Sequence, residues 1–404
     1  MKTLPIAKLK QKTEDLFKAP FFTNPKTILF LWIGISIFLG ISKTLTGRLH
    51  NNYQIYKYVF FNILDQFSLF TFQPSLYDDL NHYGPIFGFI IAPFAILPDI
   101  VGGTLWLVAL ALVLYYSVND LQLKQWQKVA IFWISTNSLI IAHTNVQFNT
   151  ATAALIILSF TLIRKEKNIW AAFVIMLGTF VKLYGIVGFA FFFFSKNKTK
   201  LLIWSLIWSI VFFVLPMLIS SPDYIIHQYK EWFVELVNKS TSNDLSFQQN
   251  ISFLGMVRKS IGNAEMSNGP MLLGAIILMA IPFLQVKKFN TDYFQLLTLA
   301  SVLIFTVLFS TGSEPNTYII AIIGVAIWFV IQPRPLSKLN IFLLIFAIAI
   351  SSFSPSDLFP RSIYKQFIQP YALQALPCTL IWLKIVYEMT FLKSNEYLHS
   401  PHNS

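Results

Sequence analysis

Two adjacent carboxylates stand in a segment that is otherwise aromatic and rich in amides. Asp78 and Asp79 lie in the sequence LYDDLNHYGP, directly before an apolar run. A carboxylate at the edge of an apolar medium has a raised pKa, and it can take a proton from a hydroxyl group. Successive helical residues point about 100° apart, so at most one of the two would face a given pocket. The alternative is a solvated helix cap or a pairing with His82.

A single lysine lies inside an apolar segment. Lys182 interrupts residues 168–195 in the sequence KLYG and divides them into two short halves. A cation in an apolar medium is costly, and ionisable residues in such places are functional hypotheses by default. Lys182 could attract an anionic headgroup from the tip of a helical hairpin. The alternative is that its long side chain only extends to the membrane surface.

Two polar stretches carry side-chain amides. Asn145, Gln147 and Asn149 link two apolar runs, where they could bind sugar hydroxyls, hold a phosphate at a helix N-terminus, or only cap helix ends. The second stretch could cradle a phosphate or form a solvated loop. It contains Gln249, Asn250 and Ser252, with Arg258 behind them.

One further carboxylate precedes a late apolar run. Glu314 lies in the sequence SEPNTY, and its simplest role is to cap the next helix.

The sequence lacks the motifs of several common enzyme classes. The sequence contains no GxxxxGK[ST] phosphate loop and no GxGxxG, which argues against an ATP-driven or dinucleotide enzyme. It also lacks the GxSxG nucleophile elbow. The histidines have no metal-ligand spacing, and the single cysteine, Cys378, excludes an internal disulfide and a Cys-based zinc cluster. We therefore expect neither a metal nor a cofactor.

The composition defines the class of protein that must position these residues. The 404 residues are 55% apolar and only 12% charged. Soluble proteins carry about 25% charge, and disordered chains are poor in apolar residues. The sequence therefore predicts an all-α polytopic membrane protein. Its net charge of +12 fits the gathering of Lys and Arg on the cytoplasmic side of a membrane, so no nucleic-acid partner is expected.

The apolar runs predict about 12 transmembrane helices, since a helix needs roughly 20 apolar residues to cross a bilayer. The runs are 27–42, 100–117, 129–142, 150–163, 168–195 (as a hairpin), 200–220, 269–286, 293–312, 318–332, 339–353 and 371–387. Residues 84–97 contain Pro85 and Pro93 and are followed directly by Pro98. We expect this broken segment to dip into the outer leaflet, where protein must cover it.

The charges decide the orientation. If residues 84–97 only dip into the membrane, 20 of the 30 Lys and Arg residues lie inside and 10 outside. If they cross it, the split becomes 13 inside and 17 outside. Only the first arrangement follows the positive-inside rule, so both termini are expected to be cytoplasmic, in a multi-pass protein of the cell membrane.

The chain is expected to form one membrane domain. Residues 1–26 form a cytoplasmic tail, 27–388 the membrane domain and 389–404 a second cytoplasmic tail. Two long outer loops, 43–99 and 221–268, are too aromatic for disorder. We expect them to form juxtamembrane helices over the outer face.

Five short segments match, in order, the motifs of one glycosyltransferase family. They resemble its D-x-x-V-Y-[RK], Y-x-P-x-F…P…LP, GQ-x-N, [IV]-K-x-[YF]-[PG] and N-Q-S-[IL]-S elements. In this chain the segments are NNYQIYK at 51–57, YGPIF at 83–87 with APF and LP behind it, NVQFN at 145–149, VKLYG at 181–185 and QNIS at 249–252.

The resemblance is to glycosyltransferase family 87, the polyprenol-phosphate-mannose-dependent alpha-mannosyltransferases of the C-type (GT-C) superfold, and covers residues from about 27 to 330. It implies an inverting membrane enzyme that uses no metal. Its donor would be a polyprenyl-phosphate-linked hexose, such as mannose, or a pentose. Its acceptor would be a lipid or glycan outside the cytoplasm, and membrane lipids would surround it.

One departure from the family pattern affects the chemistry. Asn52 stands where the resemblance implies a catalytic aspartate, and an amide cannot act as a general base. Either Asp78 or Asp79 has taken over the proton, or the chain is a divergent or inactive branch.

The predicted site has two sets of residues. The catalytic candidates are Asp78 and Asp79. The candidates for binding the donor phosphate and sugar are Asn52, His82, Tyr83, Asn145, Gln147, Asn149, Lys182, Gln249, Asn250, Ser252 and Arg258. The alternatives to an enzyme are a multi-span transporter or flippase of lipid-linked sugars, which often shows internal repeats, and a non-catalytic envelope scaffold.

Overall fold

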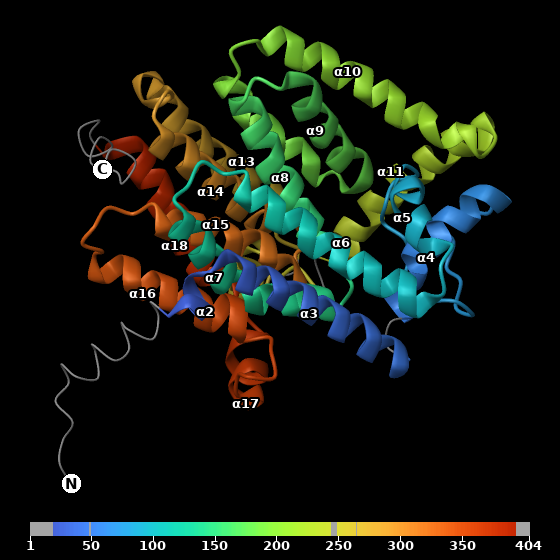
Figure 1. Cartoon of the computed structure of the whole chain (residues 1–404), viewed down its shortest axis with the longest axis horizontal. Coiled ribbons are helices and arrows are strands. Elements are labelled where there is room, and N and C mark those ends of the chain that lie inside the picture. The colour runs from blue at the N-terminus through green and yellow to red at the C-terminus, as the bar shows by residue number, and fades with distance from the viewer. Residues whose placement is uncertain (1–18, 48–49, 244–248, 264, 393–404) are drawn as a thin grey trace.

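The computed structural model describes residues 19–47, 50–243, 249–263 and 265–392, and within these ranges every regular element is a helix. The predicted tails fall largely outside the described residues. Figure 1 shows the helices packed into one bundle. The first helices are α2 (Pro20–Thr23), α3 (Pro25–Leu45), α4 (His50–Asp65), α5 (Phe87–Ala95), α6 (Asp99–Asn119), α7 (Gln125–Thr144), α8 (Asn149–Arg164), α9 (Asn168–Lys182), the 3-10 helix η1 (Tyr184–Phe194), α10 (Lys198–Val214) and the 3-10 turn η2 (Leu215–Leu218).

The second half is more irregular and contains several 3-10 and π-helical segments. Its elements are α11 (Pro222–Asn243), α12 (Phe253–Ile261), α13 (Asn268–Ala280), η3 (Ile281–Leu284), η4 (Val286–Lys288), α14 (Asp292–Leu308), η5 (Pro315–Thr317), α15 (Tyr318–Val330), α16 (Lys338–Phe346), η6 (Ala347–Phe353), α17 (Arg361–Ile363), η7 (Tyr364–Ile368) and α18 (Ala375–Phe391).

Three helices in the described part are long and apolar enough to cross a membrane. They are α3, α6 and Lys198–Leu218, each of 21 residues, which rise about 32 Å at 1.5 Å per residue. Seven shorter apolar helices accompany them. The chain is therefore a helical membrane protein, while the number of crossings stays a prediction.

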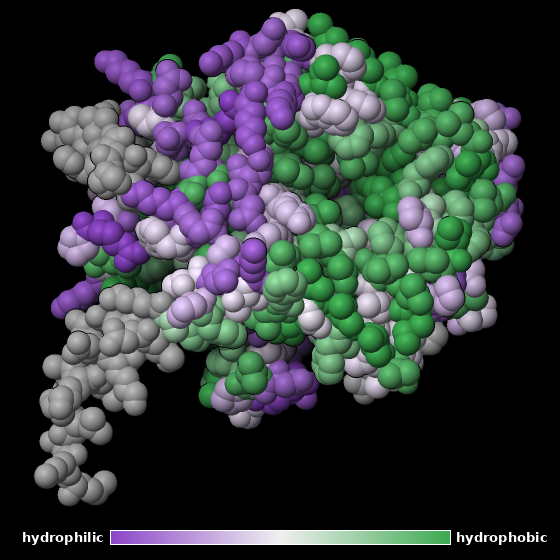
Figure 2. Space-filling view, viewed as in Figure 1, coloured by the Kyte–Doolittle hydropathy of each residue, from purple (hydrophilic) through white to green (hydrophobic). Residues whose placement is uncertain are grey.

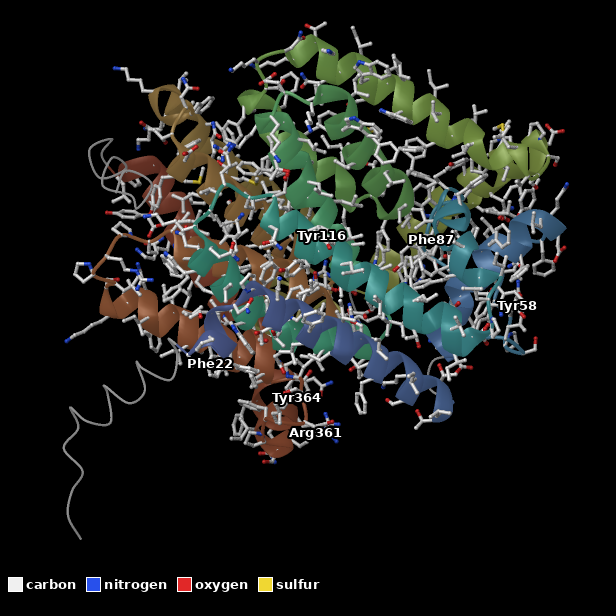
Figure 3. All side chains as sticks on the ribbon, in the orientation of Figure 1. Phe22, Tyr58, Phe87, Tyr116, Arg361 and Tyr364 are labelled. Carbon is white, nitrogen blue, oxygen red and sulfur yellow. The ribbon has the colours of Figure 1, made fainter. Side chains whose placement is uncertain are left out.

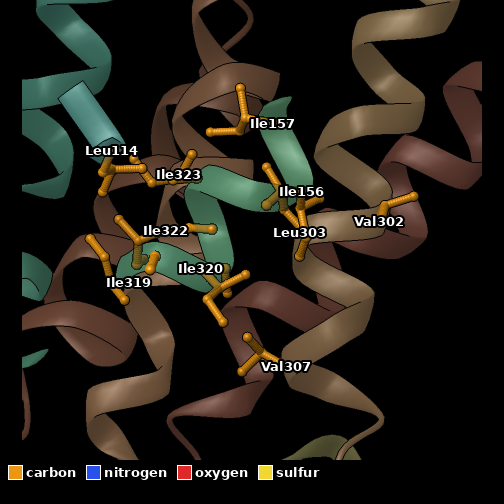
Figure 4. Packing of buried hydrophobic residues seen from close by; sticks show 14 of the residues in the cluster. Leu114, Ile156, Ile157, Val302, Leu303, Val307, Ile319, Ile320, Ile322 and Ile323 are labelled. Carbon is orange, nitrogen blue, oxygen red and sulfur yellow. The ribbon is translucent and has the colours of Figure 1, made fainter. Parts of the chain in front are cut away.

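The core of the bundle lies where α14 and α15 pack together. Every residue of α15 except Phe329 is buried, as expected of a helix that is apolar on all faces. Figure 4 shows Leu303 and Val307 of α14 beside Ile320 of α15. At Gly324 a Cβ atom would lie 2.8 Å from the carbonyl oxygen of Ala300, so only glycine allows this close approach of the two helices.

Residues 84–97 do not form a crossing helix. Their regular part, α5, has nine residues and a proline at position 93, so it rises only about 13 Å, much less than a hydrocarbon core of about 30 Å. It packs between α4 and α6. Its buried residues are Phe87, Gly88, Ile91 and Ala95, so protein covers one side of this short helix. The dip into the outer leaflet stays a prediction.

The polar break at Lys182 forms the tip of a hairpin. Leu183 adopts a left-handed conformation with φ +50° and reverses the chain between α9 and η1. The two arms meet at glycines: a Cβ on Gly178 would lie 2.9 Å from the Cα of Gly185. The missing side chains let the arms pack closely enough to hold Lys182 at the tip.

Contacts between loops show which loops share a side of the bundle. The Asn52 side chain donates from Nδ2 to the carbonyl oxygen of Asn145 at 2.7 Å. These residues lie before and after residues 84–97, and a crossing there would place them on opposite sides. At the other end, ion pairs join Lys165 to Asp120 and Arg164 to Asp292. At each end of the bundle, the loops that are predicted to lie on the same side of the membrane therefore contact one another.

Polar and apolar residues are also unevenly distributed over the surface of the bundle. Figure 2 shows hydrophobic residues over a broad area of the bundle, including α10, α6 and α3, and hydrophilic residues gathered toward the left, around α13, α14 and α18. The two predicted outer loops contain helices, α4 and α5 in the first and α11 and α12 in the second.

Candidate active site

A group of adjoining polar pockets lies at the end of the bundle where Asn52 meets Asn145. We call these pockets the polar cavity. Their volumes are about 60, 380 and 240 Å³, and Glu314 lies in the wall of all three. The smallest pocket is the junction, because it shares residues with each of the others: Asn52 and Asp79 with the larger, and Lys182 with the third.

One wall of the polar cavity comes from α4 and the chain that leads to α5. Tyr83 stacks on Phe87 with ring centroids 4.6 Å apart, and its hydroxyl lies 3.0 Å from that of Tyr56. Burial raises the pKa of Tyr83 well above its usual value, so the phenol stays neutral. His82 lies beside it, and its Nδ1 is 3.2 Å from Oε1 of Glu235. This wall is therefore largely aromatic.

Another part of the lining contains a chain of polar side chains that we call the amide relay. Lys182 Nζ lies 3.5 Å from Asn149 Oδ1, and Asn149 Nδ2 donates to Asn316 Oδ1 at 3.2 Å. Asn316 Nδ2 then donates to Glu314 Oε2 at 3.0 Å. The relay connects helices α9 and α8 with the turn η5, and it places a cation and a carboxylate at its two ends.

The lysine at the start of the relay is surrounded by aromatic rings. Its Nζ lies 5.3 Å from the ring centroid of Tyr83 and 5.6 Å from that of Tyr184. Such rings stabilise a cation through their negatively charged faces. Lys182 therefore presents a positive charge to two of the pockets from a largely enclosed position.

Only one of the two adjacent aspartates lines the polar cavity. Asp79 does so, and its Oδ1 lies 3.9 Å from Nζ of Lys239 in α11. Asp78 is exposed, is absent from the three linings, and donates its backbone N–H to Asn51 Oδ1 at 2.8 Å. The prediction assumed successive helical residues, but Asp78 and Asp79 lie in a bend between α4 and α5, so their different placement follows from the loop and not from helical spacing.

The first group of predicted amides does reach the polar cavity. Asn145 and Gln147 line the 380 Å³ pocket, Gln147 and Asn149 line the junction, and Asn52 lines both. Gln249, from the second group, also lines the 380 Å³ pocket.

Three other predicted binding residues are used elsewhere. Ser252 caps α12, accepting from Gly255 N at 3.1 Å, and donates to Asn250 Oδ1 at 2.6 Å. Arg258 donates from Nε to the carbonyl oxygen of Met266 at 2.7 Å. None of the three lines the polar cavity. Their hydrogen bonds hold the second outer loop in its fold. The spacing of these residues in the sequence is the same for this structural role as for phosphate binding.

Sequence reasoning missed or undervalued several lining residues. Glu314 does cap η5, as expected, but it also lines all three pockets of the polar cavity. The signal was present in a polar SEPNT stretch between two apolar runs. Lys239 and Gln369 had no distinguishing spacing. Tyr364 lines the 380 Å³ pocket from a segment that projects from the bundle beside Arg361 (Figure 3).

The described residues contain no group of three or more His, Cys, Asp or Glu side chains that could hold a metal ion. The polar cavity offers two carboxylates, two ammonium groups and several amides instead. Such a set can orient hydroxyl groups, stabilise an anionic leaving group and accept a proton.

The bundle and its cavity define a helical membrane protein with a polar site at one end. The model of glycosyltransferase family 87 matches residues 81–311, more than half of the chain. The chain belongs to glycosyltransferase family 87, and it is a membrane glycosyltransferase. The matched region includes α9 with Lys182 and ends just before Glu314. No curated protein matches the chain significantly.

Proposed function

We propose that the protein moves a sugar from a polyprenyl-phosphate-linked donor to a lipid or glycan acceptor on the extracytoplasmic face of the membrane, with inversion at the anomeric carbon. The sugar is mannose or another hexose or pentose. The observation that carries this proposal is the position of a polar cavity, with Lys182 and Lys239 in its lining, beside an apolar groove. A polyprenyl phosphate sugar needs both environments at adjacent places.

The apolar groove has a volume of about 350 Å³. It is lined by Val187, Ala190, Phe193, Ile276, Met279, Ala280, Phe283, Val302 and Phe305. Val187 follows Tyr184, which lines the polar cavity, by one turn of η1, or about 6 Å of rise. An isoprenyl chain in this groove would therefore place its phosphate close to Lys182.

The groups of the polar cavity suit a single displacement. The leaving phosphate monoester is acidic, so it needs charge stabilisation more than a proton, and Lys182 and Lys239 supply positive charge. The amides of Asn52, Gln147 and Asn149 would hold sugar hydroxyls. The acceptor hydroxyl must lose its proton to a base, and two carboxylates line the cavity, Asp79 and Glu314.

The charge distribution supports the outer location of the polar cavity. With a dip at residues 84–97, the predicted topology assigns 20 of the 30 Lys and Arg residues to the side opposite the polar cavity. By the positive-inside rule that side is cytoplasmic. Both termini would then be cytoplasmic, about 12 helices would cross the membrane, and the fold would be of the GT-C type.

A transfer assay tests the proposal. We expect proteoliposomes with the purified protein to transfer labelled sugar from a polyprenyl-phosphate mannose, glucose or arabinose to envelope lipids or glycans. Lys182→Met should lower transfer about 100-fold, because the leaving phosphate loses its cation. Lys200→Met is the matched control, since Lys200 is exposed on α10, and it should keep full transfer.

The absence of transfer from every such donor, with the protein folded, would contradict the enzyme reaction. Movement of intact donor across the bilayer without transfer would favour a flippase instead.

A further inference from the structure

We propose that Glu314 is the general base of this reaction and accepts the proton of the acceptor hydroxyl. The inference rests on the proposed transfer reaction and assigns a residue within its site. It is carried by the position of Glu314 between two chemically different pockets.

The two larger pockets of the polar cavity differ in their linings. The 240 Å³ pocket contains Lys182, Tyr184 and Lys239, and it lies next to the apolar groove through η1. The 380 Å³ pocket lacks all three and is lined mainly by amides, among them Asn145 and Gln249. We therefore assign the first to the donor and the second to the acceptor.

Glu314 lines the donor pocket, the acceptor pocket and the junction between them. Asp79 lines the junction and the acceptor pocket but not the donor pocket. A general base must reach the hydroxyl at the point where it attacks the donor carbon. Of the two carboxylates, Glu314 is the one present on both sides of that point.

The local structure holds Glu314 in place. It precedes Pro315, whose ring fixes the start of η5, and its backbone N–H donates to Thr317 Oγ1 at 3.1 Å. Its Oε2 accepts the Asn316 amide at 3.0 Å. A carboxylate has about four acceptor positions, so these bonds leave room for a substrate hydroxyl. Asp79, by contrast, lies on a half-exposed loop beside the ammonium group of Lys239.

The amide relay separates the two charges that the reaction needs. Lys182 and Glu314 are joined through Asn149 and Asn316. The cation can therefore bind the leaving phosphate while the carboxylate receives the entering hydroxyl.

Asn52 cannot replace Glu314 in this role. Its Nδ2 donates to the carbonyl oxygen of Asn145 at 2.7 Å, and an amide has no basic site near neutral pH.

The step balances as a displacement. The acceptor oxygen forms a bond to the anomeric carbon, and the bond from that carbon to the phosphate oxygen breaks. The electron pair of the broken bond stays on the phosphate, next to Lys182. The hydroxyl proton passes to the Glu314 carboxylate and is later released to water.

Glu314→Gln tests the assignment, because glutamine keeps an oxygen for the Asn316 amide and loses only basicity. We expect kcat to fall about 100-fold or more, with little change in the KM for donor. Asp79→Asn is the matched control and should lower kcat less than about tenfold. Glu314→Asp keeps a carboxylate, and we expect it to retain at least about tenfold more activity than the glutamine variant.

The outcomes separate the two proposals. An inactive wild type contradicts the transfer reaction itself. The assignment to Glu314 is overturned if the wild type is active and the folded Glu314→Gln variant keeps more than about a third of its kcat. It is also overturned if Glu314→Gln loses no more kcat than Glu314→Asp does. If the glutamine variant does not fold, the acidic limb of the pH profile decides between the wild type and Glu314→Asp. A shifted limb supports Glu314, and an unchanged limb overturns it.

Discussion

Glu314 and Glu388 are two carboxylates near opposite ends of the buried helix α15, and their surroundings differ. Glu388 is 2% exposed. Its Oε2 accepts from Trp328 Nε1 at 3.1 Å and from Gln332 Nε2 at 3.2 Å, and its Oε1 lies 2.9 Å from Lys384 Nζ. Glu314 has bonds from its own turn and opens onto three pockets.

The difference shows how one membrane protein uses buried charge in two ways. Glu388 lies on α18, and two of its partners, Trp328 in α15 and Gln332 just after it, come from elsewhere, so the carboxylate ties α15 to α18. It lies in none of the cavities described above. At Glu314 the partners are local, which leaves the charge available to a ligand. A fully bonded charge is typical of structure, and one at a cavity is typical of chemistry.

The largest expected effect is on stability. Glu388→Ala should lower the free energy of unfolding by about 3–5 kcal/mol, because it leaves the Lys384 ammonium and the Trp328 and Gln332 donors without their shared acceptor. Glu314→Gln should cost less than about 1 kcal/mol. Thermal unfolding of both variants in detergent measures this. Equal losses of stability would contradict the distinction between the two carboxylates.

A smaller effect is expected from filling the apolar groove. Ala190→Trp should raise the KM for long-chain polyprenyl donors about tenfold, since an indole would occupy the space of one isoprene unit. Donors with a short chain should be affected less. Leu206→Trp, on an exposed face of α10, is the control. Steady-state kinetics with donors of two lengths checks this, and an equal effect on both lengths would place the chain elsewhere.

The smallest effect is expected at Asn52. Asn52→Asp restores the carboxylate that the family resemblance implies, but it places an oxygen where the amide donates to Asn145 O. We expect activity to fall a few-fold, with a loss of about 1 kcal/mol in stability. The expected loss is checked by comparing the transfer rates of the variant and the wild type at equal protein concentration. A clear gain in rate would show that Asn52 occupies the position of the base.

Sequence reasoning predicted well what depends on hydrophobicity and local breaks. The apolar runs identified the helices, the prolines around 84–97 indicated a broken segment where the structure has a nine-residue helix, and the KLYG break predicted the hairpin tip that holds Lys182. These features are local, so the sequence records them directly.

Long-range contacts were beyond that reasoning. Nothing in the spacing of Asn149 and Asn316 shows that their amides are bonded, although 167 positions separate them. Likewise, Arg258 looked like a phosphate ligand but binds the carbonyl of Met266. Which polar residue meets a cavity depends on how the helices pack, and a single sequence does not encode this in any short pattern.

The most direct test is a structure of the protein with a non-hydrolysable phosphonate analogue of a polyprenyl-phosphate sugar. The account predicts that the phosphonate lies against Lys182, that the isoprenyl chain follows the groove between Val187 and Phe305, and that the anomeric carbon faces Glu314. An analogue bound with its phosphonate at the Glu388 end, or with its chain on another face of the bundle, would contradict the account.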